Sequence, residues 1–192
     1  MSGLSSDGGP TTTRSAAVKE RRSLFWTFSL AVYGHSAVQT ECLDLQDRYG
    51  IDVNMLLFCA YVGAAYGAVL PDAELHEATA LVNKWHKHVV QNLREARRAL
   101  KPFAAAPSPR GAAAGLRGNV KAAELEAERI EQITLEEWSA LRIDAWPRAE
   151  PAAAVAANIV ALLATCGRAA PQPQMPDRLV AAALAAARST SA

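Results

Sequence analysis

The sequence has almost no net charge and no long apolar run, and each shortage excludes a class of protein. Twenty Lys and Arg residues against 19 Asp and Glu residues leave a net charge of +1. This balance excludes a global attraction to nucleic acid or to an anionic membrane, although local patches remain to be weighed. The longest apolar stretch, Pro151–Cys166, has about 16 residues, whereas a membrane span needs roughly 20. We therefore expect no membrane partner.

Cysteine is also scarce, with three residues in the whole chain. Cys42, Cys59 and Cys166 lie far apart in apolar segments and form no CxxC pair. This pattern predicts reduced, mostly buried thiols and excludes a disulfide framework or a cysteine zinc site. Residues 1–22 lack the charged and apolar regions of a secretory signal, and their Gly, Ser, Thr and Pro predict a disordered lead-in. We expect a cytoplasmic protein.

No alternating apolar run stands between turn residues, so strands are not expected and the class is all-α. The first helix is predicted over residues 23–33, where large apolar residues leave little polar face. Ser36 with Gln39 matches a capping box at the start of a second helix. Gly50 is a typical stop for that helix.

A third helix is predicted to begin after the N-cap Asp52 and to form the centre of the fold, because it is apolar nearly all round. Its small residues, Gly63 among them, allow a neighbouring backbone to approach closely. The longest helix follows over residues 73–101, with Trp85 on its inward stripe. Its length of about 43 Å exceeds the roughly 35 Å diameter of a globule of this size, so it protrudes or pairs. Residues 23–101 are thus the predicted helical core.

The second half of the chain has less pattern. Residues 102–118 mix Pro, Gly and Ala and are predicted to be a linker. A charged helix follows over residues 119–146, divided in two if Thr134 and Glu137 form a second capping box. Residues 147–192 are Ala-rich and predict a weakly structured tail. The expected fold is a compact helical bundle with a long charged helical hairpin extension and an Ala-rich tail.

Charge is segregated between the two arms of that hairpin. The later arm is acidic, and the end of the long helix forms a candidate basic patch of Lys84, Lys87, Arg94, Arg97, Arg98 and Lys101. One interpretation is an antiparallel hairpin with complementary charges at its flanks. The other is that the basic patch contacts phosphates, although no helix-turn-helix pattern or aromatic stacking platform accompanies it.

A candidate polar cluster surrounds the Gly50 turn and contains Gln46, Asp47, Asp52 and Asn54. Capping of the following helix explains Asp52 and Asn54 most simply. A second hypothesis is a hard divalent cation held by Asp47 and Asp52, with Asp44 or Glu41. The third is a hydrogen-bonding site for a partner.

No pattern for catalysis or cofactor binding is present. His86 and His88 point about 200° apart on a regular helix and so cannot share an ion within it. The sequence contains no GxSxG or HExxH motif and no phosphate-binding glycine loop. We therefore predict no catalytic residue, no cofactor and no metal.

Three separated segments resemble a known family. They are FWTFSLAVY, CLDLQDRYGIDVNMLLFC and ELEAERIEQ, and they match the pattern FWxFSLxVY, CLxLQDxxGxDVNxLLFC and ELExERxEQ. The chain resembles, over about residues 24–141, a bacterial family of short helical proteins that is a domain of unknown function. The resemblance implies a helical core and no particular activity.

The sequence thus favours a non-catalytic module for protein–protein interaction or self-association. The overlong helix, the segregated charge and the missing catalytic motifs support this hypothesis. The alternative is a regulatory nucleic-acid-binding protein that uses the basic end of the long helix. An enzyme with an unrecognised site is the third possibility.

Overall fold

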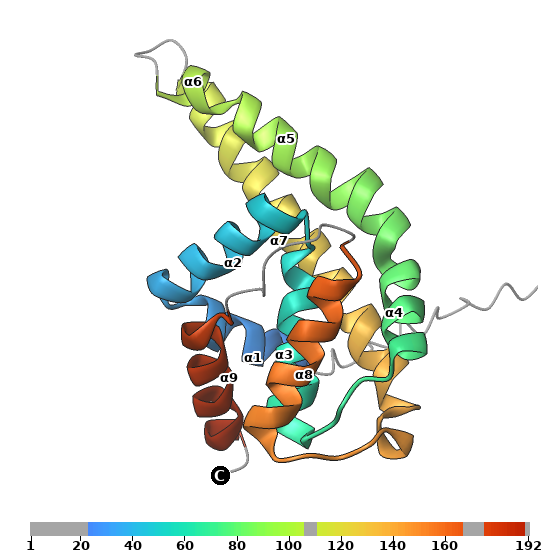
Figure 1. Cartoon of the computed structure of the whole chain (residues 1–192). Coiled ribbons are helices and arrows are strands. Elements are labelled where there is room, and N and C mark those ends of the chain that lie inside the picture. Colours follow the sequence, from blue (N-terminus) through green and yellow to red (C-terminus); the bar gives the residue numbers. More distant parts are fainter. Residues whose placement is uncertain (1–22, 106–110, 167–174, 191–192) are drawn as a thin grey trace, which may run out of the picture.

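A computed structural model of the chain describes residues 23–105, 111–166 and 175–190 (Figure 1). The predicted lead-in, residues 1–22, lies outside these ranges. The elements are, in chain order, α1 (Leu24–Tyr33), α2 (Ser36–Tyr49), α3 (Val53–Tyr66), α4 (Asp72–Trp85), a π-helical turn (His86–Val90), α5 (Gln91–Ala99), α6 (Lys101–Ala104), α7 (Gly111–Ala140), a 3-10 turn (Ile143–Ala145), α8 (Pro151–Ala164) and α9 (Asp177–Thr190). The described residues contain no strand, and the all-α class is confirmed.

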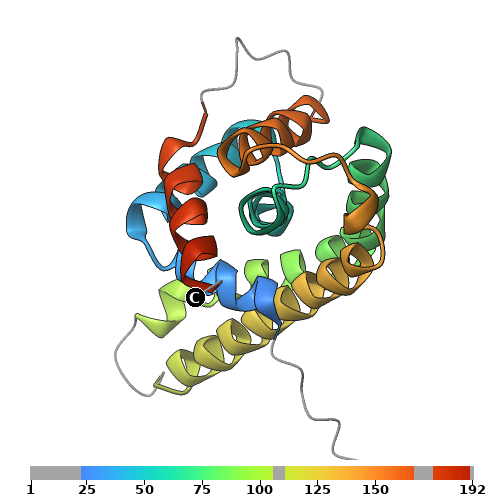
Figure 2. The same cartoon turned by 90° about the horizontal axis from the view of Figure 1, so that it is seen from below.

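Helix α3 is the centre of the fold, as predicted. Figure 2 shows it end-on, surrounded by the other helices. Every residue from Asn54 to Ala64 is buried. Asp52 caps its start by accepting a hydrogen bond from the Asn54 amide at 2.9 Å, and Gly67 ends it in the left-handed conformation. Among the described residues, no helix is long and apolar enough to cross a membrane.

The loops around α1 and α2 follow the sequence signals with one exception. Gly50 ends α2 with a φ of 70°, as expected. The predicted capping box at Ser36 and Gln39 is wrong. Ser36 is already inside the helix, and the Gln39 side chain donates instead to the Tyr33 carbonyl at 2.7 Å. Gln39 therefore ties α2 back to the end of α1.

The predicted long helix is present, but the π-helical turn changes which of its residues face the interior. The predicted stripe has Trp85 facing inward, whereas Trp85 is 36% exposed and His86 is buried. The wider turn lets His86 and Val90 both face the interior. The Trp85 indole donates to the Ala127 carbonyl at 2.9 Å, which fixes the position of α7 beside it.

The hairpin extension is longer and better ordered than expected. Its arms are α5–α6 and the first half of α7, and its tip projects from the bundle in Figure 1. Helix occupies residues 101–104 and 111–118, on both sides of a gap in the described residues, where we predicted a linker. The second capping box is not formed, because the Thr134 hydroxyl donates to the Ile130 carbonyl inside one continuous helix.

The Ala-rich segment also differs from the expected tail. Helix α8 lies against α3, and a Cβ added to Gly63 would stand 2.6 Å from the backbone nitrogen of Val155. The lack of a side chain at Gly63 therefore permits close packing of α3 and α8. Helix propensity in the sequence did not predict this contact. The Glu41 carboxylate on α2 accepts hydrogen bonds from the first amides of α9, which anchors that helix too.

The cysteines differ in burial, and this predicts their reactivity. Cys42 and Cys59 are buried, and burial raises the pKa of each thiol to about 12. Cys166 is partly exposed. Since the thiolate is the reactive form, iodoacetamide at pH 8 is expected to modify Cys166 well before the other two. Mass spectrometry of the native protein checks the order, and equal rates for all three thiols would contradict it.

Candidate functional site

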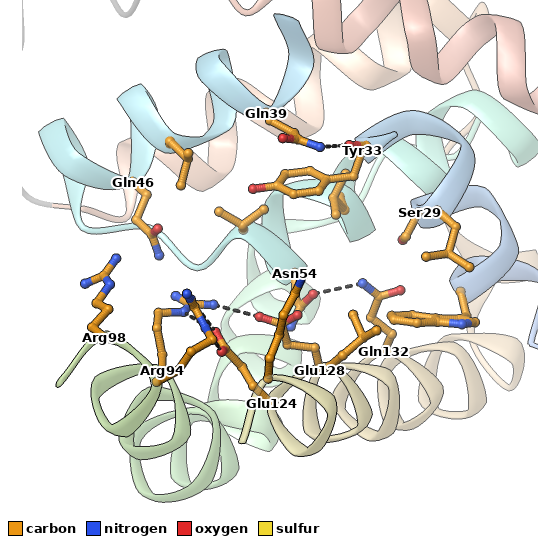
Figure 3. Close-up of a pocket in the computed structure, with 18 residues that line it drawn as sticks. Ser29, Tyr33, Gln39, Gln46, Asn54, Arg94, Arg98, Glu124, Glu128 and Gln132 are labelled. Carbon is orange, nitrogen blue, oxygen red and sulfur yellow. Dashed lines mark hydrogen bonds and ion pairs between the residues drawn. The ribbon is translucent and has the colours of Figure 1, made fainter. Parts of the chain in front are cut away.

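A groove lies between α1 and α2 on one side and the α5–α7 hairpin on the other (Figure 3). Its volume is about 480 Å³, which lies within the usual range for ligand pockets. The floor comes from α3, through Val53, Asn54 and Leu57. Helices α1, α2 and α7 of the walls pack on α3, and α5 packs on α7.

Large apolar side chains remain exposed around this groove. Leu30 on α1 is 53% exposed, Leu43 on α2 is 44% exposed and Leu125 on α7 is 47% exposed. Trp26 and Tyr33 line the same wall as Leu30. Apolar residues gathered around a concave surface are typical of a site that another molecule covers.

The hairpin wall carries a network of ion pairs. Arg94 donates to Glu124 at 3.2 Å and to Glu128 at 2.8 Å. Arg97 also donates to Glu124, with one of its contacts at 3.1 Å. These pairs join α5 to α7 and hold both arginines against the groove wall.

Two further cations line the groove without such partners. Arg98 and Lys121 are exposed, and neither forms an ion pair within the part of the chain that the structure describes. Four cationic side chains and two carboxylates line the groove, so it has an excess of two positive charges. The groove therefore combines apolar contact area with a preference for negative charge.

The floor is polar and buried at one point. The Gln132 side chain donates to the Asn54 side-chain oxygen at 2.8 Å, and Figure 3 shows the two amides facing each other. The Gln132 oxygen is buried and has no hydrogen-bond partner in the described residues. This pair links α3 to α7 beneath the groove.

A second polar cluster lies in the interior. His86 Nδ1 is 3.1 Å from Asp52 Oδ2 and 3.3 Å from Glu131 Oε2. The three side chains come from the π-helical turn, the N-cap of α3 and the middle of α7. None lines the groove.

The proximity of these groups shifts their pKa values. Burial, reinforced by the Asp52 carboxylate, raises the pKa of Glu131 to about 8. Burial alone lowers the pKa of His86, but hydrogen bonding and attraction to Asp52 and Glu131 outweigh it and raise that pKa to about 10. For Asp52 burial raises the pKa, yet the contacts with His86 and Glu131 leave it lowered. The cluster therefore holds positive charge against two acidic groups.

The structure divides the predicted polar cluster. Gln46 and Asn54 both line the groove, whereas Asp47 is exposed at the surface. Asp52 caps α3 as predicted and also faces His86, while Asn54 joins Gln132.

The hypothesis of a hard cation held near Gly50 is not supported by the arrangement. Asp44 pairs with Arg48, and Glu41 caps α9. Asp52 faces His86 in the interior, whereas Asp47, its predicted partner, is exposed at the surface.

The predicted basic patch is divided between two environments. Arg94 and Arg97 are engaged in the hairpin, as the interpretation based on complementary charge predicted. Lys84, Lys87 and Lys101 are exposed and do not line the groove. Of the six patch residues, Arg98 alone combines groove lining with the lack of an ion pair in the described residues.

The sequence predicted that α7 is acidic but not that two of its glutamates are buried. The buried residues of this helix include Glu124, Ala127, Glu131 and Leu135, at helical spacing. The same helical spacing is present in the sequence, but two of these residues are glutamates, so the pattern is typical of a solvent-exposed face.

The Glu124 network predicts a pH-dependent stability. Burial raises the pKa of Glu124, but hydrogen bonds from Arg97 and Arg94 outweigh it and lower the pKa below its ordinary value of 4.5. The stabilisation is therefore complete above pH 4.5 and is lost as the pH falls through the lowered pKa. Glu124→Gln is expected to cost about 1–2 kcal/mol at pH 7 and progressively less below pH 4.5. Urea unfolding of the wild type and of Glu124→Gln between pH 3 and 7 measures this difference in unfolding free energy. A difference that does not change with pH would contradict the role given to the Glu124 carboxylate.

Comparison with known proteins identifies a family. Residues 24–135 match the family described as "Protein of unknown function (DUF2390)". The chain belongs to this family. No curated protein and no solved structure matches it. The groove and the interior cluster both lie within the matched residues.

Proposed function

We propose that this protein is a non-catalytic interaction module whose groove binds a segment of another protein that carries acidic and large apolar side chains. The observation that carries the proposal is the position of exposed Leu30, Leu43 and Leu125 around a groove that has an excess of positive charge. Apolar contacts supply most of the affinity of such a segment, and charge complementarity selects it.

A protein partner fits the groove better than nucleic acid does. Glu124 and Glu128 line the same surface and would repel phosphates. Arg94 and Arg97 are already paired with them, so they are not available to neutralise a phosphate backbone. We propose a cytoplasmic partner, and the free thiols of the three cysteines support that compartment.

Selection from a random 12-residue peptide display library tests the proposal. The wild-type protein is expected to enrich peptides that combine Asp or Glu with Leu, Ile or Phe. The double variant Arg98→Glu, Lys121→Glu is expected to bind these peptides about tenfold more weakly and to enrich Lys- and Arg-containing peptides instead. The matched control is Lys84→Glu, Lys87→Glu, which removes two exposed cations outside the groove.

Three results would contradict the proposal. The first is a peptide preference that is the same in the groove variant and in the wild type. The second is an equal loss of binding in the control variant. The third is a salt-dependent shift of DNA or RNA in a gel that the groove variant abolishes, because this would favour the nucleic-acid alternative.

A further inference from the structure

The interior cluster of Asp52, His86 and Glu131 brings one imidazole and two carboxylates together outside the groove. One ligand atom from each residue lies within 4.8 Å of the others. We propose that these three residues bind one divalent transition-metal ion, of the class that includes Zn²⁺. This inference is independent of the function proposed for the groove.

The distances between the side chains suit such an ion. Nitrogen and oxygen ligands lie about 2.0–2.2 Å from Zn²⁺, so neighbouring ligand atoms around it are roughly 3.0–3.5 Å apart. His86 Nδ1 lies 3.1 Å from Asp52 Oδ2 and 3.3 Å from Glu131 Oε2. An ion placed between them requires only small movements of the side chains.

Burial leaves the two acidic side chains of the cluster with few partners. The Glu131 side chain is fully buried, and those of His86 and Asp52 are 10% and 16% exposed. Glu131 Oε1 is buried and has no hydrogen-bond partner among the described residues, and the buried Asp52 Oδ2 is in contact with His86 through their ion pair. His86 Nδ1 forms its hydrogen bond with Glu131, so a single N–H group does not satisfy both carboxylates. A divalent ion that displaces the proton from His86 Nδ1 to solvent would contact both carboxylates at once.

The surrounding structure holds these side chains in place. Asp52 Oδ1 accepts the Asn54 amide, which turns Oδ2 toward His86. The π-helical turn brings His86 into the interior, and such turns are frequent at functional sites. The bond from Trp85 to the Ala127 carbonyl fixes α7 one turn before Glu131. The geometry is therefore prepared before an ion binds.

The donor set selects the class of ion. Imidazole nitrogen with carboxylate oxygen suits Zn²⁺ and its first-row neighbours, whereas Ca²⁺ prefers six to eight oxygen ligands. Three protein ligands leave at least one coordination position free for water or another small ligand.

Isothermal titration of the full chain with Zn²⁺, after removal of metal by a chelator, tests the site. One ion per chain is expected to bind, and a hundredfold excess over Kd is expected to raise Tm by about 5–10 °C. Asp52→Asn is the sharpest variant, because Asn caps a helix as well as Asp does but is a poor metal ligand. It is expected to weaken Zn²⁺ binding at least ~100-fold while the helical circular dichroism is unchanged.

Two further variants keep the assignment testable. Glu131→Gln preserves the size of the buried side chain and is expected to abolish the rise in Tm. His88→Ala removes an exposed histidine two residues from His86 and is expected to leave Zn²⁺ binding unchanged. The proposal is overturned if the wild type binds no stoichiometric Zn²⁺. It is equally overturned if folded Asp52→Asn or Glu131→Gln binds it as the wild type does, or if His88→Ala abolishes it.

Discussion

Replacement of Gly63 by alanine is expected to lower the melting temperature by about 4–8 °C. The added Cβ would stand 2.6 Å from Val155 N and 2.8 Å from its Cα. These are backbone atoms, so α8 has to move away from α3 to relieve the contact. Such overpacking costs about 3 kcal/mol, which exceeds the gain of about 1 kcal/mol from replacing a helical glycine.

Gly115→Ala is the matched control, measured by the same thermal unfolding. Gly115 lies in α7, and a Cβ added there meets nothing within 4 Å. Its replacement is expected to leave the melting temperature unchanged or to raise it slightly. If Gly63→Ala behaved like this control, α8 would not pack on α3 as described.

Replacement of Asn158 by alanine is expected to cost about 3–4 kcal/mol of unfolding free energy. The Asn158 side chain is fully buried in α8. Its oxygen accepts the Leu70 amide at 2.8 Å, and its nitrogen donates to the Ala68 carbonyl at 2.9 Å and to the Cys59 carbonyl at 3.2 Å. Truncation leaves the loop after α3 without these partners in a dry interior.

Urea unfolding of Asn158→Ala and of Asn92→Ala separates this effect from a general loss of asparagine. Asn92 is exposed, and among the described residues its side chain donates only to the His88 carbonyl four positions earlier. Its replacement is expected to change the stability by less than about 0.5 kcal/mol. Equal effects at the two positions would contradict the role given to Asn158.

Both predictions concern the packing of α8, which the sequence predicted to be part of a weakly structured tail. Alanine forms helices whether or not they are packed, so composition alone does not separate α8 from a weakly structured tail. The signals were Gly63 on α3, which was predicted to allow a close neighbour, and a single Asn within an apolar stripe. Neither identifies its partner, because the contact between α3 and α8 joins residues about 90 positions apart.

The central helix and its caps could be predicted from the sequence because they depend on local signals. Asp52, Gly50 and an uninterrupted apolar run act through neighbours a few residues away, so local rules suffice. The hairpin was predictable from charge, because Arg94 and Glu124 belong to segments of opposite sign.

The candidate sites needed the three-dimensional arrangement. Asp52 and Asn54 were singled out, but as one polar cluster near Gly50. In the structure, the Asp52 side chain contacts His86 and the Asn54 side chain contacts Gln132. The π-helical turn that brings His86 inward has no sequence signal that we recognise. A glutamate such as Glu131 at a buried position is expected only when its partner is known.

The net charge of +1 did not predict a charged binding surface, because the positive charge of the groove depends on how residues are arranged in space. Arg98 and Lys121 come from opposite arms of the hairpin. Their proximity to exposed Leu43 exists only after α2 and the hairpin pack together.

The binding role of the groove is tested most directly by mapping amide chemical shifts of the isotope-labelled protein during titration with an enriched acidic peptide. The largest changes are predicted at the groove residues of α1, α2, α5 and α7, including Leu43, Arg98 and Lys121. The exposed residues Lys84 and Leu141, which do not line the groove, are predicted to be unaffected. Changes centred on residues outside the groove, with those three amides unmoved, would contradict the proposed function.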